Sequence, residues 1–418
     1  MTDRKRKSLY ICYFGLNEPL VQSQVLPYLR QLAEAGVEIH LLTFDSEKSP
    51  LESVAERERA TENLKAQGIL WNSLRYHGEP KILSTAYDVF VGVRWIIRNH
   101  SKHRFDILHA RALVPAVMAR VARFVGRLQS RILFDLRGLI IDEYLDAGVF
   151  SKGNPLVPFL RWIERSTLKS ADGVVVLSNA IRRELFPGST DQEDSVGRPL
   201  ERIPCCFDEA RFPSPDPLKR ERLRREWGLE GRLVGIYTGS TSGVYLIDEM
   251  CRVFGEFLRE DPSFFPIILT KGDASDLKRR LIENGFAPDG FMVTSAEPDA
   301  VADYLAAADF AVAFYLPTFS RLATSPTKNA EYLSAGLPIL TNAGIGDTAE
   351  EIPEDRTGVI LPDFNEESIR RSVEEMKKLL LEGDTLSTRC RQSAERRYSL
   401  RRVGGPAYLG IYERLFRL

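Results

Sequence analysis

Residues 9–44 decide the fold of this chain, and they read LYICYFGLNEPLVQSQVLPYLRQLAEAGVEIHLLTF. The compact and nearly apolar run at residues 9–14 predicts a buried strand. Residues 25–35 have helical periodicity until Gly36 stops it, and residues 37–44 predict a second buried strand. A strand, a helix and a strand joined by short connections indicate a parallel sheet that helices cover on both faces.

The same alternation continues along the chain in two blocks. The first block adds predicted strands at 107–108, 131–136 and 171–177 and helices at 114–125 and 179–185. The Pro-rich stretch at 212–217 can continue neither a helix nor a central strand, so we place the linker there. The second block predicts strands at 233–238, 265–269, 291–293, 310–314 and 338–341 and helices at 245–258, 274–284, 299–307 and 327–335. We therefore expect an α/β protein of two Rossmann-like domains, residues 1–205 and 210–395, facing each other across a cleft.

The composition excludes several classes of protein. Lys and Arg number 57 against 58 Asp and Glu, which gives no general attraction to nucleic acid. The five cysteines are scattered without a C-x-x-C pair, which argues against disulfides and zinc and suits a reducing cytoplasm. The pair His100-x-x-His103 lies among basic residues and predicts a solvated basic face rather than a metal site. No apolar run approaches the roughly 20 residues that span a bilayer, so membrane contact could only be peripheral. The helix around 87–98 mixes aromatic and arginine side chains that suit such contact.

Residues 325–338, SPTKNAEYLSAGLP, are the most informative stretch for function. Ser325 suits the N-cap of a helix, Pro326 suits its first position, and Gly336 suits its end. The first helical turn offers unpaired N–H groups and the positive end of the helix dipole, and Lys328 adds a full charge. An anionic diphosphate could bind there.

Glu331 follows Thr327 by about one helical turn, roughly 6 Å along the axis. That is about the distance from a phosphate to a ribose, and a carboxylate there could accept hydrogen bonds from both ribose hydroxyls. The alternative is a well-capped helix whose Lys328 and Glu331 are simply solvated.

This run resembles the donor-site signature of family 4 retaining glycosyltransferases with the GT-B fold, in its S-P-x-K-x-x-E-Y-x-x-A-G-x-P variant. Further segments agree with that family in order and spacing: Tyr13-Phe14-Gly15, FDILHAR at 105–111, Asp135-Leu136-Arg137-Gly138, Ala171-Asp172 before Leu177-Ser178, and Tyr237-Thr238-Gly239-Ser240. The resemblance covers nearly the whole chain. It implies a donor site that includes Gly15, Gly239, Ser240, Lys271, Arg321, Ser325, Thr327, Lys328 and Glu331.

By this resemblance, Glu331 binds the ribose, and the backbone N–H groups of Thr327 and Lys328 meet the distal phosphate. Two departures change the expectation. Ala323 stands where relatives often have a sugar-binding glutamate, and residues 240–243 (STSG) replace an arginine and lysine that many relatives carry. Lys328, Lys271 and Arg321 are then the candidates to balance the diphosphate charge.

In the first domain, His109 and Arg111 follow an apolar strand and should point into the cleft. Relatives often have a histidine at the position of Arg111, so we expect Arg111 to contact a phosphate or a sugar hydroxyl. The alternative is a packed His109 with Arg111 paired to a local carboxylate.

Asp135 and Arg137 lie at and after another strand end, where similar enzymes contact their acceptors. Asp142 and Glu143 follow in the same segment. A structural cluster of salt bridges is the alternative for this group.

The resemblance implies transfer of a sugar from a UDP- or GDP-sugar to a hydroxyl with retention, in cell-surface polysaccharide or glycoconjugate synthesis. We expect the leaving diphosphate to take the acceptor's proton, with no metal or other cofactor. The acceptor would be a sugar or a lipid-linked sugar, and the C-terminal helix at 396–418 would cross back to the first domain. The protein would be a cytoplasmic monomer or homodimer, with contact at the inner membrane face left open. A sugar-nucleotide epimerase of the same fold and a catalytically silent nucleotide-binding homologue are the alternatives.

Overall fold

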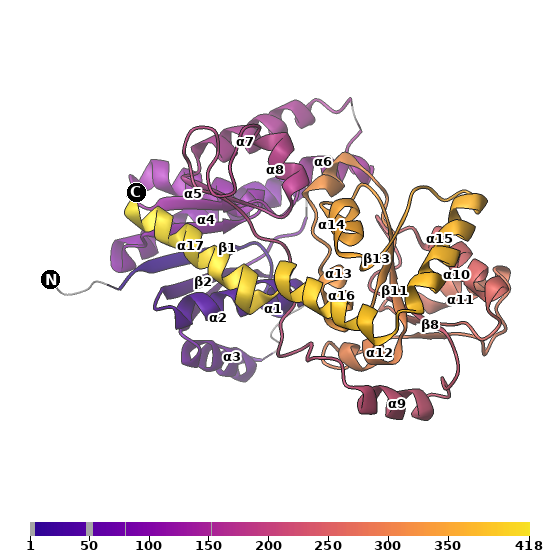
Figure 1. Cartoon of the computed structure of the whole chain (residues 1–418). Helices are drawn as coiled ribbons and strands as arrows, with labels where there is room; N and C mark the ends of the chain where they lie inside the picture. The colour runs from indigo at the N-terminus through magenta and orange to yellow at the C-terminus, as the bar shows by residue number, and fades with distance from the viewer. Residues whose placement is uncertain (1–4, 47–52, 80, 152) are drawn as a thin grey trace. The chain divides into compact units, whose positions relative to one another are not determined.

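The structure is a computed structural model that describes residues 5–46, 53–79, 81–151 and 153–418 (Figure 1). It divides into two compact units, Met1–Pro204 with Leu400–Leu418, and Cys205–Ser399. The boundary lies upstream of the Pro-rich stretch in which we placed the linker. Phe212 is buried in the core of the second unit, and Asp216 accepts hydrogen bonds from the first turn of the helix α9 (Pro217–Glu226). These prolines therefore begin an element of the second unit rather than separate the two units.

In the described part of the first unit, seven parallel strands form a sheet in the order β3-β2-β1-β4-β5-β6-β7. The strands are β1 (Lys7–Cys12), β2 (Glu38–Asp45), β3 (Ile69–Arg75), β4 (Ile107–Arg111), β5 (Arg131–Asp135), β6 (Gly173–Val176) and β7 (Leu200–Arg202). Every residue of β4 and of β6 is buried, as expected where helices cover both faces of a parallel sheet.

The helices of the first unit lie on the two faces of this sheet (Figure 1). They are α1 (Pro19–Gln24), α2 (Leu26–Glu34), α3 (Val54–Ala66), α4 (Lys81–His103), α5 (Leu113–Gly126), α6 (Ile140–Asp146), α7 (Leu156–Ser170), α8 (Asn179–Leu185) and α17 (Gly405–Arg417), which the π-helical turn η2 (Leu400–Gly404) precedes. The helix α17, yellow in Figure 1, contacts α2, β4 and β7. The end of the chain thus completes the first unit.

The second unit has six parallel strands within its described residues, in the order β10-β9-β8-β11-β12-β13. They are β8 (Val234–Thr238), β9 (Phe265–Leu269), β10 (Met292–Thr294), β11 (Phe310–Ala313), β12 (Ile339–Asn342) and β13 (Gly358–Leu361). The helices, besides α9, are α10 (Ile247–Glu260), α11 (Ala274–Glu283), α12 (Val301–Ala307), the 3-10 turn η1 (Phe319–Ala323), α13 (Thr327–Ser334), α14 (Thr348–Asp355), α15 (Glu366–Leu380) and α16 (Asp384–Arg397). Two apolar clusters form the core of this unit.

The predicted α/β class with two parallel sheets is confirmed. Three strands were missed, namely β3, β7 and β13, and each lies at an edge of its sheet. An edge strand needs fewer apolar residues, and β3 has Asn72 and Ser73 in its middle while β7 has three residues. The sequences of β3 and β7 therefore lack the continuous apolar runs that identified the central strands, whereas β13 is apolar but has only four residues.

In each sheet, the order of the strands along the chain proceeds in opposite directions on the two sides of one pair of neighbouring strands. We call the position between these two strands the switch point of the sheet. The first switch point lies between β1 and β4, and the second lies between β8 and β11. In doubly wound sheets, ligands bind beyond the carboxyl ends of the strands at such a point.

Candidate functional site

Lys328 in the first turn of α13 lies at the second switch point. Its Nζ atom is 4.3 Å from the ring centre of Tyr237 on β8, 4.1 Å from that of Tyr245 and 5.5 Å from that of Tyr315. These three residues form the tyrosine cluster. Tyr245 follows β8 along the chain, and Tyr315 comes just after β11, so both strands of the switch point bring aromatic rings to one ammonium group.

The backbone around Lys328 is fixed by the loop that follows β8. Gly239 has φ +132°, and a Cβ atom at this position would lie 2.9 Å from Lys328 Nζ. The loop returns to β11, because Tyr245 and Tyr315 form an antiparallel bridge and the Leu246 N–H donates to the Phe314 carbonyl at 3.2 Å. Gly239 is therefore required both for its positive φ and for the space that it leaves to Lys328.

Lys328 is buried, with 9% of its surface exposed, and no ion pair to it is present in the described part of the chain. Among the described residues, neither Lys328 Nζ nor the buried Tyr315 hydroxyl has a hydrogen-bond partner. Burial lowers the pKa of Lys328 to about 7, against a smaller upward effect of the Glu331 charge. Positive charge on a buried amine is costly without a counter-ion, so this site would gain from an anionic ligand.

Glu331 lies one turn further along α13 and keeps part of its side chain exposed. Burial raises its pKa to about 7, while the charges of Arg211 and Lys328 act in the opposite direction. No hydrogen bond to its carboxylate is recorded within the described residues. A carboxylate and an ammonium, neither of them hydrogen-bonded within the described residues, thus lie one turn apart on the same helix.

The start of α13 differs from the prediction by one residue. Pro326 is the N-cap, Thr327 is the first helical residue, and no described side chain caps this end of the helix. The prediction of Ser325 as the cap is wrong, because its hydroxyl accepts a hydrogen bond from the Cys205 N–H at 3.1 Å. The first N–H groups of α13 are consequently left for another acceptor.

Tyr332 holds α13 against β8. Its hydroxyl accepts a hydrogen bond from the Thr238 N–H at 2.8 Å and lies 3.0 Å from Thr238 Oγ1. This contact orients the helix start toward the switch point. Tyr237 and Tyr332 were named from the sequence as parts of motifs, but no role was assigned to them. Tyr245 and Tyr315 were not predicted as site residues, because an aromatic residue alone does not indicate contact with a cation.

The remaining predicted donor residues differ in burial and in their contacts. The charge of Arg321 on η1 acts on the pKa values of both Tyr245 and Tyr315, so it lies near the tyrosine cluster. The carbonyl of the exposed Ser240 accepts a hydrogen bond from the Tyr237 hydroxyl. Lys271 follows β9 as an exposed side chain. Gly15 belongs to the first unit, where a Cβ atom would lie 3.3 Å from the Cα of Asp45.

The structure brings His109, Arg111, Asp135 and Arg137 into one buried cluster in the first unit. The carboxylate of Asp135, which is fully buried, accepts hydrogen bonds from the Tyr408 hydroxyl at 2.7 Å and from Arg137 Nε at 2.8 Å. His109 Nε2 lies 3.5 Å and Arg111 Nη1 3.9 Å from the same oxygen, Asp135 Oδ2. Burial alone would raise the pKa of Asp135, but Arg137 and His109 outweigh it and hold this pKa well below its usual range.

His109 is a packed histidine within this cluster. Its Nδ1 atom lies 2.9 Å from the Tyr412 hydroxyl, which lies 2.9 Å from Ser8 Oγ, and its ring contacts Tyr10 at 4.3 Å between centres. Burial lowers the pKa of His109 despite the neighbouring Asp135. The cluster therefore fits the structural alternative that the sequence left open for His109 and Arg111.

A second polar group at the carboxyl ends of the first sheet was missed. The buried Asp88 of α4 accepts hydrogen bonds from the Tyr13 hydroxyl at 2.6 Å and from the His77 N–H at 3.0 Å, and His77 Nδ1 lies 2.6 Å from its other oxygen. A carboxylate thereby orients the half-exposed imidazole of His77, an arrangement suited to hydrogen bonding or proton transfer.

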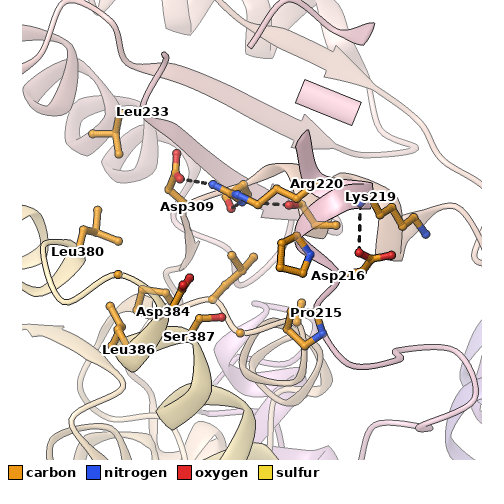
Figure 2. A pocket seen from close by; sticks show the side chains of 18 of the residues that line it. Pro215, Asp216, Lys219, Arg220, Leu233, Asp309, Leu380, Asp384, Leu386 and Ser387 are labelled. Atoms are coloured by element: carbon orange, nitrogen blue, oxygen red, sulfur yellow. Dashed lines mark hydrogen bonds and ion pairs between the residues drawn. The ribbon is translucent and has the colours of Figure 1, made fainter. Parts of the chain in front are cut away.

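Figure 2 shows a cavity of about 710 Å³ in the second unit, and Lys328 is not among the residues that line it. It includes Arg220 and Asp309, which form an ion pair, and Lys219, which pairs with Asp303. None of the predicted site residues lines it. Because Lys219, Arg220 and Asp309 are already in ion pairs, we do not assign the cavity to the nucleotide.

Comparisons with known proteins agree with this architecture. Residues 21–193 match the family model of the glycosyl transferase 4-like domain. No curated protein sequence matches the chain. Among the described residues, no helix combines the length and apolarity needed to cross a bilayer.

Solved structures share the fold along the whole chain. Sucrose-phosphate synthase from Thermosynechococcus elongatus has a TM-score of 0.69 at 14% identity, with 99% of this chain and 100% of that chain covered. A glycosyltransferase from Rickettsia africae has a TM-score of 0.68 at 15% identity, with 99% of each chain covered. HepE of Anabaena, in complex with UDP-glucose, has a TM-score of 0.67 at 13% identity, with 98% and 100% covered. The fold is that of the GT-B glycosyltransferases.

Proposed function

We propose that this chain transfers a sugar from a nucleoside diphosphate sugar to an acceptor hydroxyl, with retention at the anomeric carbon. The observation that carries the proposal is Lys328, a buried amine without an anionic partner at the second switch point. The family match of residues 21–193 and the GT-B fold support the same class of reaction. The complex of HepE with UDP-glucose supports a nucleotide-sugar donor.

In this proposal, Lys328 and the uncapped N-terminus of α13 bind the diphosphate. The two negative charges would restore the charged form of Lys328, whose pKa burial otherwise lowers. Glu331, one turn further along, accepts hydrogen bonds from the ribose hydroxyls. One short helix would thus hold two parts of the donor.

The proposed reaction breaks the bond between the anomeric carbon and the diphosphate oxygen and forms a bond from that carbon to the acceptor oxygen on the same face. The acceptor's proton moves to the departing diphosphate. Lys328 and the helix dipole stabilise the negative charge that develops on the leaving group. No metal is needed in this scheme, so nucleotide affinity should survive EDTA.

On the acceptor side, the contacts predicted for Asp135 and Arg137 remain predictions. Both side chains are buried and already bonded to Tyr408. Within the proposal, they would act by fixing the ends of the strands rather than by presenting free groups. Transfer to candidate sugar and lipid-linked acceptors must be tested separately from donor binding.

The experiment is calorimetric titration with nucleosides and nucleoside diphosphates of uracil and guanine. We expect Lys328→Met to weaken the diphosphate at least tenfold and to leave the nucleoside unchanged, with a smaller effect at high salt. Lys278→Met removes an exposed lysine of α11 that is not among the predicted donor residues, and it is the matched control. Equal effects of the two lysine variants would contradict the diphosphate assignment.

The ribose assignment is tested by a double-mutant cycle. Glu331→Gln should weaken nucleoside and diphosphate alike, by roughly 1 to 3 kcal/mol. A 2′-deoxy ligand should lose affinity for the native protein but lose little more for Glu331→Gln, because both changes remove the same contact. If the two penalties simply add, Glu331 does not bind the ribose. Nucleotide binding without donor turnover would favour a catalytically silent protein instead.

A further inference from the structure

The first unit gathers three metal-ligating side chains at the amino ends of its strands. One ligand atom each from Glu38, His40 and His103 lies within 4.8 Å of the others. This edge of the sheet is opposite to the carboxyl ends at which doubly wound folds bind their substrates. The cluster is therefore independent of the proposed sugar transfer.

Secondary structure fixes the positions of these three side chains. Glu38 and His40 are two residues apart on β2, so they point to the same face of the sheet. His103 is the last residue of α4, and Arg104 with φ +52° turns the chain toward β4. The Asp106 N–H then donates to the Lys7 carbonyl at 2.9 Å, which ties this turn to β1.

The contacts within the cluster suit a shared cation. His40 is buried, its Nε2 atom lies 2.9 Å from Glu38 Oε1, and its ring centre lies 4.5 Å from that of His103. Both imidazoles also contact the ring of Phe105, at 5.0 and 5.7 Å between centres. Ligand atoms of a four-coordinate metal with bonds of about 2.0 to 2.2 Å lie a little over 3 Å apart, so small side-chain movements would suffice.

We propose that Glu38, His40 and His103 bind a divalent transition metal, Zn²⁺ in preference to Mg²⁺ or Ca²⁺. Two imidazoles and one carboxylate are a ligand set that zinc accepts, whereas the two hard cations prefer oxygen ligands. A bound ion would join β2 to the end of α4. The fourth ligand would be water, because no further metal-ligating side chain of the described residues belongs to the group.

Lys7 is the competitor for this site. Its Nζ atom lies 3.1 Å from Glu38 Oε1, the same oxygen that contacts His40. The ammonium of Lys7 therefore neutralises the negative charge of Glu38 that would attract a metal ion. Replacing Lys7 by methionine should strengthen metal binding, whereas a purely structural ion pair predicts no metal binding in either protein.

The test is calorimetric titration of the chelator-treated full chain with ZnCl₂, and with MgCl₂ as the second cation. We expect one Zn²⁺ per chain, no Mg²⁺, at least 100-fold weaker Zn²⁺ binding by His103→Gln, and tighter binding by Lys7→Met. His100→Gln is the matched control, because His100 lies one turn earlier on α4 and outside the cluster.

A second readout is the thermal transition with and without metal. Zn²⁺ should raise it in the native protein and in His100→Gln but not in His103→Gln. Glu38→Gln, which keeps the shape of the side chain, should behave like His103→Gln and guards against a folding defect in one variant. Failure of the native protein to bind Zn²⁺, or equal binding by His103→Gln and His100→Gln, would overturn the proposal.

Discussion

The two switch points of this chain differ in how their buried charges are compensated. At the first, the buried charges of Arg111, Asp135 and Arg137 contact one another, and α17 adds hydroxyl groups to the network. At the second, Lys328 is buried among tyrosine rings, and no anionic group of the described residues pairs with it. Removing one charge from a paired cluster leaves its partners buried and uncompensated, whereas a buried cation without a counter-charge would be stabilised by a bound anion. We therefore propose that the second switch point binds the anionic ligand and that the first stabilises the fold.

The largest change in stability is expected from Asp135→Asn in the first unit. The substitution keeps the shape of the side chain but leaves Arg137 and Arg111 buried without their carboxylate, which should destabilise the protein by about 3 to 5 kcal/mol. Urea denaturation measures the loss, and native-state hydrogen exchange assigns it to the first unit. Glu34→Gln, an exposed carboxylate of the same unit, should change stability by less than about 0.5 kcal/mol. A similarly small effect of Asp135→Asn would show that the cluster is not a stabilising network.

At the second switch point we expect a substitution that removes the buried charge to raise the free energy of unfolding rather than lower it. Lys328→Met removes a buried amine that has no hydrogen-bond partner among the described residues, so it should stabilise the second unit by roughly 1 to 3 kcal/mol at pH 7 while it weakens diphosphate binding at least tenfold. The pKa of Lys328 is lowered to about 7 on folding, so its cost is fully present below pH 7 and disappears as the pH rises to about 10.5. The advantage of the variant should shrink over that range. A destabilised Lys328→Met protein would mean that the amine has a structural partner.

The pH dependence of diphosphate affinity tests whether Lys328 is the group that binds the diphosphate. Below about pH 7 Lys328 is charged, and above it the unliganded amine loses its proton, so diphosphate affinity should fall by up to tenfold per pH unit. Glu331 also has a pKa of about 7 and gains charge in the same range, which would mask this trend. The titration is therefore made with Glu331→Gln between pH 7 and 9, and the double variant Lys328→Met/Glu331→Gln is the control. Equal slopes in the two variants would exclude Lys328 as the titrating group.

The smallest effect is expected from Tyr412→Phe in the first unit. The variant loses the hydroxyl that lies between Ser8 and His109, at a cost of about 1 kcal/mol. It should leave nucleotide affinity unchanged, because the hydroxyl belongs to the packed cluster. Denaturation and nucleotide titration of the same preparation measure both quantities, and a changed affinity with unchanged stability would assign a ligand role to this cluster.

The sequence by itself determined the class of fold and the position of α13. The central strands were found because they are buried on both faces and need continuous apolar runs, and Gly336 correctly marked the end of α13. Lys328 and Glu331 were singled out because their spacing is set by helix geometry, which is local. The exact cap was missed, because the partner of Ser325 is Cys205, 120 residues away along the chain.

Tertiary structure alone decided what surrounds these residues. Tyr245 and Tyr315 reach Lys328 from the segments that follow β8 and β11, and Tyr408 and Tyr412 of the last helix pack on the first sheet. His103 meets Glu38 and His40 only because α4 ends beside β2. Burial and the presence or absence of a counter-charge depend on contacts between distant segments, and those contacts determine whether a charged side chain supports the fold or waits for a ligand.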